Sequence, residues 1–416
     1  MSAEKEAGIS RTETSSRRKK KYYRKLTKIQ YILLREALSN PRFELVKEVM
    51  PALGLENTPY SSLVRIARDI AFRKDLLGLA FSPYRADLER YVVAFKLKGE
   101  FERSSAIDVA RFLPYNYWIK SITISTMPMG DTRVYYLIPR GENMNTIVEK
   151  LRKSEIIDDK ESIFVHKMDL SYYQVPDLAK YCPDHRKCPL SIEETFKIID
   201  KEGLKEPDTS ELEDLDPRPP PDVIDVVLMS LLEVRYIFSP RWLSRGGPLM
   251  IGVEKARYHF LKHIRNKYLL GAYLRRPLNP RAELMYTFII RGGETLKLGY
   301  TLSRTPYANV LCDPLNVCVI TFWIRSEDIS KVDQLISRYN VRIVRQDQRV
   351  ILPEEAEGKT LRSLRVGFPI HCYSIKGRRW YTLKESEKNV TKNIRRLKKK
   401  FKKAQWAVFL VPQYLS

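Results

Sequence analysis

The chain has 416 residues, of which 44% are hydrophobic and 11% aromatic, so it can build buried cores and is not globally disordered. Lysine and arginine number 74 against 50 acidic residues, and the formal charge of +24 favours a polyanionic partner, most commonly nucleic acid. No apolar run reaches the roughly 18 residues that span a bilayer. The five cysteines are scattered and do not indicate a secreted disulfide framework. We therefore expect a protein of the cytoplasm or nucleoid with no membrane partner.

Residues 1–24 are polar and form a basic tail that includes Arg18, Lys19 and Lys20. Apolar residues at helical spacing predict three helices within residues 25–85: one from residue 26 to about 38, a short one over 43–52, and a third from 59 to about 72. The outward face of the third helix carries Tyr60, Ser61, Arg65 and Arg68.

A different pattern fills residues 88–170. The predicted elements are a strand at 91–97, a helix at 105–113, strands at 118–126 and 133–138, a helix at 143–153 and a strand at 162–168. This βαββαβ order is typical of a ferredoxin-like sandwich, with helices on one face of an antiparallel sheet. Residues 171–221 are acidic and end in prolines, so we interpret them as a linker with a helix near 192–200.

The same order of elements returns after the linker. Residues 222–281 contain predicted helices at 223–236 and 253–267, with a short element at 241–243 between them. The outward face of the last helix carries Lys255, Tyr258, His259, Lys262 and His263. Residues 283–353 again have a βαββαβ pattern. Its predicted strands are 283–290, 307–311, 317–324 and 341–351, and its predicted helices are 294–303 and 327–339.

The last segment, residues 354–416, is a basic extension with interleaved aromatic residues. A basic run at 393–403 includes Lys399 and Lys400, and a strand-like piece follows at 406–411. Such runs neutralise phosphates without reading sequence, although a solubilising tail or a solvated helix face has the same composition.

Two helix-turn-helix patterns in one chain indicate a two-headed DNA-binding protein, because this motif places one helix in the major groove. Both halves resemble the leucine-responsive (Lrp/AsnC, feast/famine) family of transcription regulators. The residues that carry the resemblance are LGLENTP with LVRIARDI in the first half, and IGVEKARYHFLKHI with YLLGAYLRRPLNP in the second. It covers residues 26–168 and 223–352.

The resemblance implies an α+β fold, with two helix-turn-helix (winged-helix) domains that are each followed by a ferredoxin-like sandwich of the RAM/ACT type. Two such units in tandem imply an internal pseudo-dimer. The implied partner is double-stranded DNA. A Gly-Asp element marks the effector pocket of the family; it is present at Met129-Gly130-Asp131 and lacks its glycine at Cys312-Asp313-Pro314. A small-molecule effector is therefore implied more strongly for the first half.

No nucleotide-binding, nucleophile or metalloprotease motif is present, so we expect neither enzymatic activity nor a cofactor. Cys182, His185 and Cys188 could ligate zinc, but they lack the usual spacing and a fourth ligand nearby, so no metal is expected. Two alternatives are an RNA- or ribosome-associated factor and an enzyme of the siroheme decarboxylase type, which shares the helix-turn-helix plus sandwich plan. The charge of +24 argues against the enzyme.

Overall fold

The structure is a computed structural model. It describes residues 26–41, 54, 57, 59–70, 76–127, 130–168, 176–207, 220–234, 252–275, 278, 282–313, 315–351 and 363–400. Several predictions concern residues outside these ranges: the tail with Arg18, Lys19 and Lys20, the helix at 43–52, the element at 241–243 and the strand at 406–411. The side chains of Arg68, Lys399 and Lys400 also lie outside the description.

The first sheet has five antiparallel strands in the order β11-β3-β4-β2-β5. Its strands are β2 (Leu88–Lys96), β3 (Ile119–Thr123), β4 (Asp131–Pro139), β5 (Phe164–Lys167) and β11 (Ser363–Arg365). Helices α5 (Ala106–Phe112) and α6 (Asn145–Arg152) connect them, so the chain order from β2 to β5 is βαββαβ.

The second sheet repeats this order with four antiparallel strands, β10-β7-β9-β8. Its elements are β7 (Leu284–Arg291), α14 (Thr295–Ser303), β8 (Ala308–Asp313), β9 (Val317–Ile324), α15 (Ile329–Ser337) and β10 (Arg342–Val350). In both sheets the first strand of the run lies between the third and the fourth. The α+β class with antiparallel sheets, as predicted, is confirmed.

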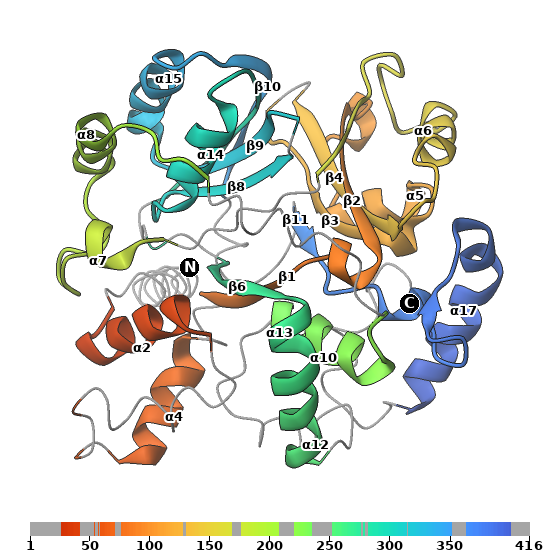
Figure 1. The fold of residues 1–416 in the computed structure, drawn as a ribbon. Helices are drawn as coiled ribbons and strands as arrows, with labels where there is room; N and C mark the ends of the chain where they lie inside the picture. The colour runs from red at the N-terminus through yellow and green to blue at the C-terminus, as the bar shows by residue number, and fades with distance from the viewer. Residues whose placement is uncertain are drawn as a thin grey trace, which may run out of the picture.

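Alternation along the strands explains why each sheet is covered on both faces. In β7, Tyr286, Phe288 and Ile290 pack with the core under α14 and α15, whereas Ile289 points to the opposite face. There Ile289 joins Val319 of β9 and Val92 of β2 in one buried apolar cluster. The two sheets therefore contact each other face to face, and their helices lie on the outer sides (Figure 1).

Ion pairs join the two sheets around this apolar cluster. Arg345 of β10 contacts Asp131 of β4 at 2.8 Å, and His166 of β5 pairs with Asp313 of β8. Both carboxylates belong to the elements that the family resemblance assigns to an effector pocket. In this structure they connect the sheets.

Below the sheets lie two groups of helices. The first head comprises α2 (Lys28–Ser39) and α4 (Tyr60–Arg68). The second head comprises α10 (Val223–Val234) and α12 (Val253–Tyr258), which continues through a π-helical stretch, η6 (His259–Ile264), into α13 (Arg265–Lys267). A strand follows each head, β1 (Leu77–Phe81) and β6 (Leu269–Leu274), and the two pair with each other antiparallel. Neither strand is predicted from the sequence pattern.

Two segments interpreted as linker and extension contribute to the cores. Helix α8 (Ile192–Glu202) buries Ile192, Phe196 and Ile199 in the core of the second sheet, and the short α7 (Leu178–Tyr181) precedes it. At the other end of the chain, β12 (Tyr373–Ser374), β13 (Arg379–Trp380) and α17 (Leu383–Lys400) pack against the first half. Residues 363–397 are thus part of the folded body, and in the described part of the chain no helix has the length and apolarity to cross a membrane.

Short 3-10 turns complete the described elements: η3 (Tyr84–Ala86), η4 (Gly99–Phe101), η5 (Asn116–Trp118), η7 (Ser326–Asp328) and η8 (Ile370–Cys372).

The contact between the sheets should contribute to the stability of the folded protein, and this can be tested. Replacing Ile289 by Ala should lower the free energy of unfolding by about 2–4 kcal/mol, because it removes buried methyl groups and leaves a cavity between two sheets. The matched control is Ile343→Ala in the same sheet, where the side chain is 41% exposed and a small effect is expected. Chemical denaturation followed by circular dichroism measures both. Equal losses for the two variants would contradict a tightly packed interface.

Candidate functional site

The helix faces predicted to contact DNA divide into exposed and inward-facing residues. Lys255, Tyr258 and Lys262 are exposed on α12 and its continuation, and Tyr258 is 56% exposed. Tyr60, Ser61 and Arg65 are exposed on α4. Figure 1 shows α4 and α12 at the end of the molecule opposite the two large sheets.

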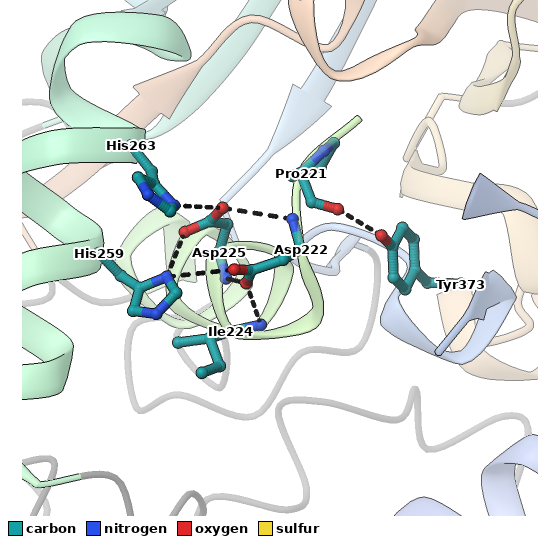
Figure 2. A network of polar contacts seen from close by, with 7 residues as sticks. All are labelled: Pro221, Asp222, Ile224, Asp225, His259, His263 and Tyr373. Carbon is teal, nitrogen blue, oxygen red and sulfur yellow. Dashed lines mark hydrogen bonds and ion pairs between the residues drawn. The ribbon is translucent and has the colours of Figure 1, made fainter. Parts of the chain in front are cut away.

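The two histidines differ from this expectation. His259 is only 6% exposed, and its Nδ1 lies 2.9 Å from Oδ1 of Asp225. Nδ1 of His263 lies 3.2 Å from Oδ2 of the same carboxylate (Figure 2). Helical spacing predicts both on the outward face, whereas the structure directs their rings toward Asp225 at the start of α10. Ala256, Phe260 and Ile264, which helical spacing assigns to the core, are buried as well, so the buried face of this helix is wider than predicted and includes His259.

A cavity of about 210 Å³ lies between the two sheets, next to the end of α10. Its lining includes five cationic side chains and one carboxylate, that of Glu233. The cationic residues are Arg90, Lys120, Arg133, Arg275 and Arg365. Tyr135 and Trp323 add aromatic surface, so the cavity combines positive charge with an apolar wall.

Lys120 and Glu233 form a buried ion pair across the two halves of the chain. Their side chains are 6% and 1% exposed. Burial lowers the pKa of Lys120 to about 7, although the charge of Glu233 acts in the opposite direction. A lysine of this kind can take up or release a proton near neutral pH.

A second buried pair lies on the same side of the sheets. Arg133 of β4 is 3.7 Å from Asp347 of β10, and burial raises the pKa of the Asp347 carboxyl. Lys120, Arg133 and Glu233 are not among the site residues predicted from the sequence. Each is a charged residue within an otherwise largely apolar strand or helix, and this is the feature of the sequence that could have indicated a buried ion pair.

The cysteines take two arrangements. Cys312 and Cys318 form a disulfide between neighbouring positions of β8 and β9. Cys182 is buried near the partly buried Cys188, and both are free thiols. The Cys312 disulfide occupies the position where the second copy of the effector element lacks its glycine.

Comparisons with known proteins give a coarse result. No protein-family model and no curated protein matches the chain. Two solved structures of the siroheme decarboxylase NirDL are similar to it, each at 10% sequence identity. One matches with a TM-score of 0.41 over 78% of this chain and 93% of that chain. The other, a co-complex with an iron-uroporphyrin III analogue, matches with a TM-score of 0.40 over 73% and 87%.

These comparisons correct one expectation. The prediction that the chain is not an enzyme was wrong, because the solved structures to which it is similar are those of an enzyme. At 10% identity this similarity concerns the fold alone and assigns this chain neither an activity nor a substrate.

The lowered pKa of Lys120 predicts how the stability of the folded protein depends on pH. The pKa of Lys120 is near 10.5 in the unfolded chain and about 7 in the folded protein. Between these two pH values the unfolded chain therefore binds more protons than the folded protein. The contribution of Lys120 therefore makes stability rise with pH across this window. In the double variant Lys120→Met/Glu233→Leu, which leaves no charge unpaired, that contribution should be lost. Urea unfolding at a series of pH values tests this; identical slopes in both proteins would show that Lys120 has an ordinary pKa.

Proposed function

We propose that the chain is a DNA-binding protein of the Lrp/AsnC type, a transcription regulator or a nucleoid-associated protein. In this proposal each head is a helix-turn-helix, and each sheet with its two connecting helices is a ferredoxin-like domain. Support comes from the βαββαβ order in both sheets, in which the first strand lies between the third and the fourth. One unit following the other along the chain would make a pseudo-dimer by itself.

The observation that carries the proposal is the position of the two exposed helix faces. Because α4 and α12 lie at one end of the molecule, one DNA duplex could contact both (Figure 1). The exposed residues are of the types that contact phosphates and base edges, with Lys255 and Lys262 on the second head and Ser61 and Arg65 on the first. The +24 charge adds attraction that does not depend on sequence.

The second head should bind DNA more strongly than the first. Replacing Lys255 and Lys262 by Ala should weaken binding more than replacing Ser61 and Arg65, because only the first change removes two cations. It should also reduce the slope of log affinity against log salt by about 2, roughly one unit for each lost phosphate contact. Fluorescence anisotropy with a labelled duplex at several salt concentrations measures both quantities.

The matched control removes the same charge elsewhere. Lys153 and Lys160 are exposed near α6, beside the sheets, so Lys153→Ala/Lys160→Ala should leave affinity nearly unchanged. An equal loss in this control would mean that net charge alone attracts DNA. Tighter binding to an RNA of equal length would favour the RNA-associated alternative.

A second candidate function concerns the cavity between the sheets. Five cationic residues and one carboxylate at its wall favour a small anion, either a polycarboxylate or a phosphate compound. We propose this ligand as an effector or a substrate of the protein. The proposal rests on the balance of charge in the lining and on the volume of about 210 Å³.

Citrate and tripolyphosphate are suitable probes. At least one should raise the unfolding midpoint of the wild type, because a ligand that binds only the folded state stabilises it. Arg365→Gln should reduce this shift, whereas Arg111→Gln, on an exposed surface of α5, should not. Shifts that are equal in all three proteins would point to nonspecific anion binding at the surface.

A further inference from the structure

Four nitrogen and oxygen donors converge where α10 begins. They belong to Asp222, Asp225, His259 and His263, and one donor atom from each residue lies within 4.8 Å of the others (Figure 2). Asp225 and His259 are buried, with side chains 4% and 8% exposed, whereas Asp222 and His263 are partly exposed. The set therefore has a buried side and an open side.

The first helix of the first head begins with the same pattern of capping hydrogen bonds, but with different side chains. Ahead of α2, Thr27 and Gln30 exchange side-chain and backbone hydrogen bonds, and the Gln30 amide then donates to Asp69 beyond α4 at 2.9 Å. Ahead of α10, Asp222 and Asp225 exchange the equivalent bonds. The capping geometry is thus shared, and capping alone does not require two carboxylates and two imidazoles.

The two histidines reach one carboxylate from consecutive turns of one helix. Nδ1 of His259 and Nδ1 of His263 lie 2.9 and 3.2 Å from the two oxygens of Asp225, and Nδ1 of His259 lies 3.4 Å from Asp222. Zinc bonds to such donors are about 2.0–2.2 Å long, which separates the ligand atoms of a tetrahedral ion by about 3.3–3.6 Å. Small rotations of the side chains would bring the four donor atoms to the separation that a tetrahedral ion requires.

We propose that this cluster binds one divalent transition-metal ion, with Zn²⁺ as the best match. Two imidazoles and two carboxylates suit Zn²⁺ or Co²⁺, whereas Mg²⁺ and Ca²⁺ prefer all-oxygen sites and Cu⁺ prefers sulfur. Histidines at positions i and i+4 of one helix face are a recurrent zinc-binding arrangement. The bound ion would also offset the negative charge of a buried carboxylate.

Binding here would connect two parts of the second head. The aspartates hold the start of α10, and the histidines lie on the segment that also presents Lys262. The carbonyl oxygen of Pro221, just before the cluster, accepts a hydrogen bond from Tyr373 of the C-terminal segment (Figure 2). An ion at this site would fix the exposed face of α12 relative to the body of the protein.

The test is a metal titration of the full chain after removal of metals with a chelator. We expect one equivalent of Co²⁺ per chain with the absorption bands of a tetrahedral nitrogen–oxygen site, and displacement of Co²⁺ by Zn²⁺. His259→Gln and His263→Gln should each weaken binding by at least about tenfold, the scale on which even outer partners of metal ligands act. Zn²⁺ should raise the unfolding midpoint of the wild type and not that of His263→Gln.

The control variant His185→Gln/Cys188→Ser removes the other candidate donor set and should bind metal as the wild type does. His263 is partly exposed, so its variant should fold, and circular dichroism without metal verifies this. The proposal is overturned if the wild type binds no equivalent. It is equally overturned if the equivalent survives both histidine variants or is lost in the control. Because the readout is metal binding itself, the result is independent of whether the heads bind DNA.

Discussion

Helix α10 is buried on all sides from Asp225 to Val234, and this burial constrains the structure around it. Its aliphatic residues need apolar neighbours, but it also carries carboxylates near both ends. Breaking a buried ion pair costs on the order of 3–5 kcal/mol, so each carboxylate needs a partner in place. Asp225 contacts the histidines of the second head, and Glu233 pairs with Lys120 of the first sheet. The helix thereby joins the second head to the first sheet.

The face-to-face contact of the two sheets is the second constraint on the fold. A sheet with helices on one face and a second sheet on the other has no face left for water, which explains the nearly continuous burial along β4, β7 and β9. Asp131 and Asp313 pair across this contact with Arg345 and His166. Where the family resemblance suggests effector binding, this chain has inter-sheet ion pairs, and the cationic cavity lies elsewhere between the sheets.

Much of the fold could be predicted from periodicity, because the core side chains of these elements recur at the spacing of one face. The predicted strand at 317–324 coincides with β9, and the predicted helix at 294–303 differs from α14 by one residue. Strands β1 and β6 were missed since LGLAF and LLGAYL lack alternation, and their pairing joins segments almost two hundred residues apart. Their close approach uses Gly78, where an added Cβ would lie 2.8 Å from both the Tyr273 ring and the Glu233 carbonyl oxygen. The candidate sites depend on such contacts: Lys120 meets Glu233 only after the two halves have assembled, and Asp225 meets His259 only after the helices of the second head have packed together.

The positive charges of this protein fall into two physical classes. Lys255 and Lys262 are exposed, so their attraction to a polyanion is screened over a Debye length of about 10 Å at 0.1 M salt. Lys120 and Arg133 are buried against carboxylates and are screened much less. Raising the salt concentration should therefore weaken polyanion binding by the heads more than anion binding in the cavity. Helix α10 nonetheless has one end at each place, about 12 Å apart from Asp225 to Glu233 at 1.5 Å per residue. A ligand that displaces Glu233 from Lys120 and an ion that tightens the donors around Asp225 would act on the same helix, so neither site can change without the helix accommodating it.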